Sequence, residues 1–577
     1  MSAEEQTTSD LTARLARQLA IPLLGARLLR RLGITDAEQG HNFLFPTLAS
    51  LPNPWLLKGV EEGVKLVLAA QARKTPVLVF GDYDVDGVCA TVILVTFLQT
   101  MNMDVDWYIP DRIAQGYGLS ASAVQGICAK TTPPGLVITV DNGITAIDEI
   151  RQLRENGFSV LITDHHKPEK TLPEADAIIN PHQPGCNFPF ADLAGAGVAF
   201  FLIMALRSAL VKNKQWSRAG APNLKEYLDL VALGTVADAM PLRETNRVLT
   251  RAGLEILSDQ KRPGLKALCS LTGITEPGSS VTGEDISFRL APRINAAGRM
   301  GNASAAVKLL QARDMARATK AAALLEEVNN RRKSIQEEMT QEAIDQCEKI
   351  HEKQPNILVL FRENWHLGVV GIVAAKICER YQRPTLVLAD DPHEDGQIKG
   401  SGRGTGACDL FAEIRQCADL LSGFGGHSQA IGLKLPKSNL QPLVDRLNRV
   451  TNSSIYHENT GELRHNIIEI ERIDEVLNKD FMYFLHAMEP FGQNNPEPIF
   501  LYQGARALRP TLVKKRHLRF SLQWSEDRHC DVIAFYQGEK LSLLKNNNID
   551  IRFRIRKNTY QGQERVQLVA ENISASL

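Results

Sequence analysis

Three carboxylates stand at alternate positions directly after a short apolar run. The run is Val77–Phe80, and the acids are Asp82, Asp84 and Asp86. Carboxylates this close to one another repel unless a cation lies among them. The spacing therefore predicts the first part of a divalent-metal site, at the end of a buried strand. Val88–Leu98, which follows, has the composition of a helix that packs back on the sheet.

Two other roles are compatible with acids at this place. Asp86 precedes an apolar helix and could be only its N-terminal cap. The pattern D-x-D-x-D-G also opens a calcium loop, which needs a bidentate acid at its twelfth position. That position is Ile93, and the preceding run reads as a strand rather than as a helix. The calcium loop is therefore excluded, whereas capping stays open for Asp86.

Two further acidic clusters also follow short apolar runs. Asp141 comes directly after Leu136–Val140, and the triplet Asp164-His165-His166 comes after Val160–Thr163. Imidazole together with carboxylate suits manganese, magnesium or zinc and needs no thiolate. Adjacent side chains point in different directions, so we expect one histidine to bind metal and the other to face substrate.

The elements that must position these residues repeat strand, loop and helix from about residue 77 to 240. This alternation predicts a mainly parallel sheet with helices on both faces. In such folds ligands bind beyond the carboxyl ends of the strands, which is where all three clusters fall. Besides these three clusters, Asp238, after the apolar stretch Leu228–Ala237, is a fourth candidate that could reach the same crevice.

The ordered series of motifs resembles the DHH phosphoesterase superfamily, which is named for the triplet seen here. The resemblance implies hydrolysis with two Mg²⁺ or Mn²⁺ ions. It implies as metal ligands Asp82, Asp84, Asp86, Asp141, His165 and Asp238, and as catalytic residues Asp84, Asp141, His165, His166 and Asp238. Pyrophosphatase-like members carry a histidine four residues before the acid that matches Asp84, and here that position is Phe80. The division of the first three acids between two ions is therefore left open.

Residues 285–301 gather three arginines among small side chains, namely Arg289, Arg293 and Arg299. Guanidinium groups bind phosphate in a bidentate manner, and small neighbours let a nucleic-acid backbone approach. The alternative is a loop whose arginines pair with the acids upstream. The stretch resembles the RecJ branch of the superfamily, where it closes the first domain.

A helical segment without Pro or Gly follows at Ala303–Lys353 and is long enough to connect two domains. The polar sequence Asn329–Lys333 predicts a break or bend within it.

A second, smaller α/β unit is predicted next, with strands at Ile357–Phe361 and Thr385–Ala389. Its glycine-rich segments, at 400–404 and 423–427, read as loops whose amides could face a phosphate. Tight turns are the alternative. The unit resembles the DHHA1 domain, and this resemblance implies substrate contacts by Arg403 and His427.

The C-terminal part is predicted to be an OB-like β-barrel. Its β-patterned segments are Phe500–Tyr502, Leu518–Trp524, Asp531–Phe535, Ile549–Ile555 and Arg565–Ala570. Residues 505–557 hold 13 Lys and Arg against five Asp and Glu, an excess of eight positive charges. Interleaved aromatic and basic side chains suit single-stranded nucleic acid, whose bases stack on aromatic rings. Lys515 and Trp524 are predicted to contact the nucleic-acid strand, whereas Phe520 and Phe553 are predicted to lie in the core of the barrel.

The chain as a whole is electrically neutral, so a polyanion must be met by a local patch. Its 577 residues suggest roughly three or four domains. The predicted boundaries are a helical segment at 1–50, the phosphoesterase domain at 51–302, connecting helices at 303–353, the second α/β domain at 354–455 and the barrel at 456–577.

The nine cysteines include no C-x-x-C pair, which argues against structural zinc or a disulfide framework and fits a reducing cytoplasm. The first ten residues lack the apolar core of a signal peptide. The longest apolar run, Val198–Leu206, is too short to span a bilayer, so no membrane association is expected.

Together these features resemble the RecJ family and imply a single-stranded-DNA-specific exonuclease. By that resemblance it digests from the 5′ end, releases 5′-mononucleotides, serves recombination and repair, and works with a single-strand-binding protein and a helicase. We expect a monomer. Two other functions stay open: a phosphodiesterase or pyrophosphatase for small molecules or oligonucleotides, and a non-catalytic single-strand-binding protein. The basic barrel argues against the first, and the complete set of acids and histidines argues against the second.

Overall fold

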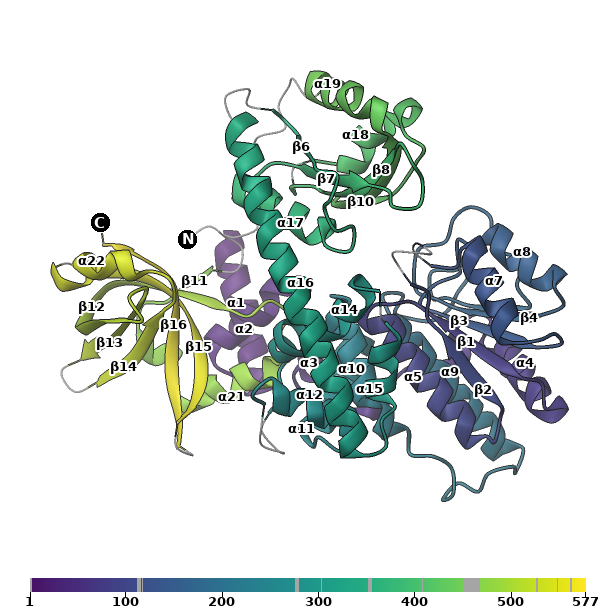
Figure 1. Ribbon diagram of the computed structural model, residues 1–577. Coiled ribbons are helices and arrows are strands. Elements are labelled where there is room, and N and C mark those ends of the chain that lie inside the picture. The colour runs from purple at the N-terminus through teal and green to yellow at the C-terminus, as the bar shows by residue number, and fades with distance from the viewer. Residues whose placement is uncertain are drawn as a thin grey trace. The chain divides into compact units, whose positions relative to one another are not determined.

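The computed structural model describes residues 3–111, 116, 118–274, 280–301, 303–350, 355–406, 408–450, 467–525, 528–546, 548–560 and 563–576. The chain forms two compact units (Figure 1). Unit 1 consists of Met1–Ser50, Pro241–Arg247 and Thr460–Leu577, and unit 2 of Leu51–Met240 and Val248–Asn459. The predicted polar linker at 451–462 lies outside the described residues.

Unit 2 begins with the predicted parallel sheet, ordered β2-β1-β3-β4-β5. Its strands are β1 (Val77–Gly81), β2 (Val105–Tyr108), β3 (Leu136–Val140), β4 (Ser159–Thr163) and β5 (Ala177–Ile179). β1 and β3 are buried along their whole length, which explains why they read as unbroken apolar runs. The half-exposed β2 lies at one edge of the sheet and was not predicted.

Helices flank this sheet, and β1, β3 and β4 lie beside α7 and α8 on one face in Figure 1. The helices are α4 (Val60–Arg73), α5 (Val85–Thr100), α7 (Ala121–Lys130), α8 (Ile147–Glu155), α9 (Gly195–Lys212), α10 (Leu228–Ala237), α11 (Glu244–Ser258) and α12 (Pro263–Leu271). α5, α9 and α10 pack on one another and are apolar on nearly every face.

Helix α9 is longer than the apolar run that suggested it. Its 18 residues are long and apolar enough to cross a membrane by length and composition, which the shorter run had not indicated. However, 67% of that span is buried inside the protein, where it packs on α5 and α10. A buried core helix meets the same criterion of length and composition. The packing of α9 identifies it as such a core helix.

Short helices lead to a long one. They are α13 (Gly283–Asp285), the π-helical turn η4 (Ile286–Leu290), α14 (Ala291–Arg299) and α15 (Ser304–Leu310), followed by α16 (Met315–Ile350). The predicted break at Asn329–Lys333 is wrong, because α16 continues through it. The Arg332 side chain donates hydrogen bonds to the side chains of Asn329 and Gln336, each about one helical turn away. The polar residues that had suggested a loop therefore bond to one another within the helix.

The second α/β part carries a mixed sheet in the order β6-β7-β8-β10-β9. Its elements are β6 (Leu358–Phe361), α17 (Val370–Tyr381), β7 (Thr385–Asp390), β8 (Gln397–Arg403), α18 (Leu410–Arg415), β9 (Gly423–His427), β10 (Ala430–Pro436) and α19 (Leu440–Val450). The two glycine-rich segments predicted as loops lie largely in strands β8 and β9. Glycine has low intrinsic β propensity, but the antiparallel ladder with β10 overrides it here.

Unit 1 contains the predicted C-terminal barrel. Its strands are β12 (Ile499–Val513), β13 (His517–Ser525), β14 (Arg528–Ala534), β15 (Ile549–Tyr560) and β16 (Gln563–Ala575), with β11 (Ile467–Glu469) added beside β12. The order β12-β13-β14-β16-β15 closes through pairing of β12 with β15. Phe520 and Phe553 are buried, as predicted.

The N-terminal helices share the hydrophobic core of this barrel. α1 (Ala3–Leu19), α2 (Leu23–Arg31), α3 (Ala37–Leu44) and α21 (Lys479–Met488) lie in unit 1 together with the short α22 (Leu541–Asn546). Leu15 and Leu29 belong to the same buried cluster as Phe484, Phe500 and Phe553. Residues 1–50 are therefore part of the core of unit 1 rather than an independent segment, while the five predicted boundaries remain a prediction.

Arg247 lies in the middle of unit 1 and is only 1% exposed. Its guanidinium lies 3.8 Å from the centroid of the Phe43 ring. It donates hydrogen bonds to the backbone carbonyls of Phe43, Ala487, Glu489 and Pro490, at 2.5 to 3.5 Å. These carbonyls lie at or just beyond the C-terminal ends of α3 and α21, where helix carbonyls lack intrahelical partners and carry partial negative charge.

Candidate metal centre

The first acidic loop joins β1 to α5. Asp82 directly follows β1 and is 1% exposed. Asp84 is the N-cap of α5, and its Oδ1 accepts hydrogen bonds from the backbone amides of Asp86 at 2.9 Å and Gly87 at 3.0 Å. The capping alternative is thus realised by Asp84 rather than Asp86.

Asp86 instead points at the N-terminus of α9. Its two carboxylate oxygens accept hydrogen bonds from the amides of Gly195 at 2.6 Å and Ala196 at 2.9 Å. A Cβ at Gly195 would lie 2.7 Å from the Cβ of Asp141, so only glycine lets α9 approach this closely. Sequence reasoning missed Gly195, and its one local signal is a Gly-Ala-Gly run at the start of an apolar helix.

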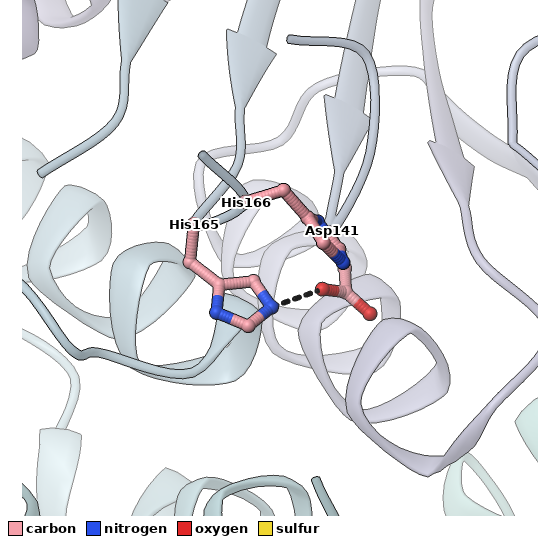
Figure 2. A group of neighbouring side chains, drawn as sticks. All are labelled: Asp141, His165 and His166. Carbon is pink, nitrogen blue, oxygen red and sulfur yellow. Dashed lines mark ion pairs between the residues drawn. The ribbon is translucent and has the colours of Figure 1, made fainter. Parts of the chain in front are cut away.

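Asp141 follows β3 in a left-handed backbone conformation, with φ of 61°. His165 Nε2 lies 3.0 Å from Asp141 Oδ1, the contact drawn in Figure 2. The two atoms are as close as the partners of an ion pair, but they do not form a hydrogen bond. Asp141 Oδ1 is buried and has no hydrogen-bond partner. A buried carboxylate oxygen in this state is ready to accept a cation.

Asp164 holds His166 in place. Its Oδ1 lies 2.7 Å from His166 Nδ1 and accepts hydrogen bonds from the backbone amides of His165 and His166. Its Oδ2 accepts from the amide of Ile144 at 3.0 Å. One oxygen thus serves the loop of the two histidines and the other the loop after β3, so Asp164 orients the histidines while Asp141 and its neighbours face the crevice.

The two adjacent histidines differ in charge. Burial and the charge of His166 lower the pKa of His165 to about 4, so its imidazole is neutral and suited to ligate metal. Burial lowers the pKa of His166 as well, but its hydrogen bond to Asp164 and that carboxylate's charge outweigh burial and raise it to about 9. His166, 43% exposed, is therefore a cation at neutral pH.

Three groups of donor atoms each gather within 4.8 Å. They are Asp82, Asp84 and Asp141; Asp86, His165 and Asp238; and Asp141, His165 and His166. Asp238 is the C-cap of α10, so a helix end supplies this acid, whereas loops that follow strands supply the others. Carboxylate and imidazole donors are those that Mg²⁺ and Mn²⁺ accept.

The metal-free acids repel one another. Burial, followed by the charge of Asp84, raises the pKa of Asp86 to about 7. Burial and the charges of Asp86 and Asp84 raise the pKa of Asp238 to about 8 and raise that of Asp141 as well. Five carboxylates beside a neutral imidazole, several of which have raised pKa values because of their mutual repulsion, fit a site for a cation of high charge.

Phe80 takes no part in this centre. It is fully buried among the apolar residues of the sheet, with its ring 5.8 Å from that of Tyr108. The position that suggested a histidine ligand by resemblance to pyrophosphatase-like members is therefore part of the core here, and the donors of the centre are those of the three groups.

Helix α14 supports the loop that carries the first acids. Asn295 Oδ1 accepts a hydrogen bond from the backbone amide of Val85 at 3.2 Å. A Cβ at Gly298 would lie 2.6 Å from the carbonyl oxygen of Tyr83, so glycine allows the helix to lie against the loop. Sequence reasoning missed both residues, which lie more than 200 positions from the loop they hold.

The three predicted arginines of this region differ in their surroundings. Arg289 lies 3.1 Å from Asp285, an acid upstream of it as the alternative expected, whereas Arg293 lies 2.5 Å from Glu326, a downstream acid on α16. Arg299 lines a cavity of about 340 Å³ next to Asp238, with Val236, Ala237 and Ala239 among its walls.

Arg403 and His427 are brought together across the second sheet. Ala430 of β10 pairs with Arg403 of β8 on one side and with His427 of β9 on the other. Residues directly opposite in antiparallel strands project to the same face, so the three side chains share a face. Arg403 donates to the Ser401 hydroxyl at 2.8 Å, while His427 is exposed.

Lys515 lies at the tip of the β12–β13 hairpin, where Lys514 and Lys515 both have left-handed φ values, of 50° and 58°. Left-handed φ values favour Asn and Gly, so two lysines at these positions place positive charge at the hairpin tip at a conformational cost. Trp524 packs on the barrel core and donates from Nε1 to Asp474 at 3.0 Å.

The aromatic residues exposed beside this hairpin are Phe535 and Tyr536, at 49% and 68%. Both rings pack edge-on against His517, and the Arg516 guanidinium lies 5.1 Å from the centroid of the Tyr536 ring. We call Lys514, Lys515, Arg516, Phe535 and Tyr536 the hairpin patch.

Comparisons with known proteins match all three parts of the chain. Residues 76–235 match the model of the DHH family, N-terminal domain, residues 354–453 that of the DHHA1 domain and residues 469–572 that of the RecJ OB domain.

Two curated relatives are single-stranded-DNA-specific exonucleases RecJ. That of Bacillus subtilis is 35% identical over 99% of this chain and 70% of its own, and that of Escherichia coli is 34% identical over 99% and 98%. The solved structure of RecJ in complex with Mn²⁺ from Thermus thermophilus is similar with a TM-score of 0.79 at 29% identity, over 98% of this chain and 78% of that one. The predicted DHH, DHHA1 and OB architecture is thus confirmed, and the chain belongs to the family of RecJ single-stranded-DNA-specific exonucleases.

Proposed function

We propose that this chain digests single-stranded DNA from the 5′ end and releases 5′-mononucleotides by metal-dependent hydrolysis, in recombination and repair. The observation that carries the proposal is the group of five acids and a neutral histidine, most of them buried, at the carboxyl edge of the parallel sheet. Membership of the RecJ family supports the substrate, and the basic hairpin patch supports a long strand over a small phosphate ester.

The donor groups suggest how three acids on one loop serve two ions without a histidine at Phe80. Asp82 and Asp84 would hold one ion, and Asp86 would hold the other together with His165 and Asp238. Asp141 belongs to the first group and contacts His165 of the second, so it joins the two. When bound, two divalent ions activate water and stabilise the departing oxygen.

His166 serves the leaving side of the reaction. Hydrolysis breaks the bond between phosphorus and the 3′ oxygen of the terminal nucleotide, and that oxygen leaves as a hydroxyl after it gains a proton. His166 is protonated at neutral pH, and Asp164 fixes its ring through Nδ1. It therefore contacts the scissile phosphate and can donate the proton.

The remaining predicted substrate contacts are retained as part of the proposal. Arg403 and His427 share one face of the second sheet, Arg299 lines the cavity beside Asp238, and Lys515 lies in the hairpin patch. Arg289, Arg293 and Trp524 contribute mainly through their internal partners Asp285, Glu326 and Asp474.

The cellular setting is proposed on more general grounds. All nine cysteines are free, which suits the reducing cytoplasm. The single-strand-binding protein, the helicase and the monomeric state are proposed from the family resemblance. The predicted domain boundaries are proposed with the amendment that residues 1–50 belong with the barrel.

Digestion of matched single strands labelled at the 5′ or the 3′ end tests the proposed reaction. We expect a 5′ label to appear at once as a mononucleotide in the presence of Mn²⁺ or Mg²⁺, while a 3′ label stays on progressively shorter strands. A blunt duplex should persist. Early release of the 3′ label would overturn the polarity, and faster hydrolysis of pyrophosphate or a dinucleotide would favour the small-molecule alternative.

The hairpin patch predicts a specific loss of strand affinity. Stacking of a base on an aromatic side chain contributes about 1–3 kcal/mol. Tyr536→Ala should therefore weaken binding of an oligothymidylate by about 5- to 100-fold, as measured by fluorescence anisotropy without metal. Tyr483→Ala is the matched control, because Tyr483 is 66% exposed on α21 of the same unit. Equal binding by the two variants would remove the hairpin patch from the strand's path.

A further inference from the structure

Arg332 also lines the cavity beside Asp238, and it has no part in the metal centre or in the predicted substrate contacts. The walls of the cavity include Arg332 of α16, together with Arg299 and Asn295 of α14 and Ile372 of α17. Asn295 also holds the metal loop through Val85, and three residues around Asp238 complete one wall. The cavity is therefore adjacent to the metal centre by its lining residues.

Arg332 is oriented by neutral groups. Its Nη1 donates to Gln336 Oε1 at 2.7 Å, and its Nη2 donates to Asn329 Oδ1 at 2.8 Å. Both amides are buried, with 7% and 0% of their residues exposed, so they fix the guanidinium rigidly. Its Nε is buried without a hydrogen-bond partner.

The positive charge of Arg332 is not neutralised within the described part of unit 2, where no carboxylate oxygen lies within 4.0 Å of it. This distinguishes it from Arg289 and Arg293, which pair with Asp285 and Glu326. Burial and the neighbouring charge of Arg293 lower the pKa of Arg332, so the cation is held in surroundings that disfavour it. A bound anion would relieve this cost.

We infer that Arg332 is a phosphate-binding residue, and that the cavity it lines takes a phosphate group of the nucleic acid next to the scissile bond. Two buried amides present a planar guanidinium, which suits the tetrahedral oxygens of a phosphate. Arg299 and Asn295 add donors to the same cavity. The inference rests on the proposed function for the identity of the anion, while the anion site itself stands on the cavity and the uncompensated charge.

The phosphate has two sources in the proposed reaction. It is either that of the released 5′-mononucleotide or one further along the strand. Both have the same chemistry, and inhibition by the product distinguishes them. If the mononucleotide occupies the cavity, loss of Arg332 weakens inhibition by dTMP. If only the strand does, dTMP inhibits the variant and the wild type equally.

The test compares Arg332→Gln with Arg332→Lys and with Lys333→Gln, all in the full chain. Lys333 is exposed on the same helix, so its substitution removes the same charge without touching the cavity. Binding of a 3′-labelled oligothymidylate in EDTA is measured by anisotropy over a range of salt, and digestion with Mn²⁺ gives KM and kcat.

We expect Arg332→Gln to weaken binding and raise KM by about 10- to 100-fold, as for one charged hydrogen bond to phosphate. The slope of log affinity against log salt should fall by about 0.7 for the one lost contact with a single strand. Arg332→Lys should keep most of the affinity, and Lys333→Gln should behave like the wild type.

Two results would overturn the inference. One is an Arg332→Gln protein that binds and digests like Lys333→Gln. The other is an equal defect in Arg332→Gln and Arg332→Lys with a matching fall in thermal stability, which indicates that Arg332 only supports α16. Binding in EDTA needs no hydrolysis, so it tests phosphate binding by Arg332 even if the wild type digests no DNA and the proposed function fails.

Discussion

An Asp141→Asn protein will lose metal-dependent digestion of single-stranded DNA by about 10³-fold or more. The carboxylate joins the two donor groups, and a metal site contributes several kcal/mol of charge stabilisation in the transition state. Asparagine keeps the shape and tolerates the left-handed backbone at this position at least as well as aspartate does. The loss should therefore appear in kcat, measured with saturating oligothymidylate and Mn²⁺, without loss of the fold.

Thermal unfolding separates this result from misfolding. The metal-free variant should be at least as stable as the wild type, because one member of a repelling group has been neutralised. Its unfolding temperature should rise much less with added Mn²⁺, since ligand-linked stabilisation depends on affinity. Asp176→Asn is the control, because Asp176 lies at the opposite end of the same sheet and accepts from Val160. Digestion by Asp141→Asn at the rate of this control would refute the assigned centre.

The pH dependence of the metal-free wild type gives an independent readout of the same repulsion. The folded pKa values of Asp86 and Asp238, about 7 and about 8, exceed the ordinary value of 3.8. The folded state therefore binds more protons than the unfolded state between these limits. The associated stability is fully present below about pH 4 and is lost as pH rises through 7 to 8. Asp141→Asn should flatten this decline, and saturating Mn²⁺ should reverse it.

Replacing Arg247 with methionine will destabilise unit 1 by about 3–5 kcal/mol, because four backbone carbonyls around a buried site lose their donor. Methionine retains much of the volume, so the loss reflects charge and hydrogen bonds rather than a large cavity. Hydrogen exchange followed by peptide is the suitable measurement, because the chain has two units and one melting temperature would mix them. Exchange should accelerate in α3 and α21 while β1 and β3 keep their protection.

Arg243→Met is the control for this experiment. Arg243 lies four residues away on the same segment, is exposed, and donates a single hydrogen bond to the carbonyl of Asn494 at 3.1 Å. Its loss should cost less than about 1 kcal/mol. Equal exchange in the two variants would mean that the buried guanidinium does not hold α3 and α21.

The sequence alone predicted the parallel sheet and the placement of its acids, because both depend on local patterns. Asp82 and Asp141 follow fully buried strands, and the rule that ligands bind at carboxyl ends placed them in one crevice. The barrel was predictable for a similar reason, since its five strands alternate and its basic excess is local.

What could not be predicted depends on contacts between distant residues. The partner of Asp86 is the N-terminus of α9, whose one local signal is its Gly-Ala-Gly run, and the partner of the Val85 amide is Asn295, which has no local signal. The glycine segments were predicted to be loops because their strand pairing is imposed by β10. The uncompensated charge of Arg332 also depends on the tertiary structure. Several sides of α16 are polar, and its sequence does not show which charged side chain has an oppositely charged partner.

The shared core of unit 1 has a consequence for the order in which the protein matures on the ribosome. Leu15 and Leu29 belong to the same buried cluster as residues as late as Phe553 and Ile573. The first helices to be synthesised must therefore wait for the last strands, roughly 25 to 100 s at usual elongation rates. Meanwhile the parallel sheet can complete itself from residues that emerge early. The nascent chain should thus acquire its metal-binding sheet before its barrel, and the exposed leucine faces of α1 and α2 are a place where a chaperone would bind in the interval.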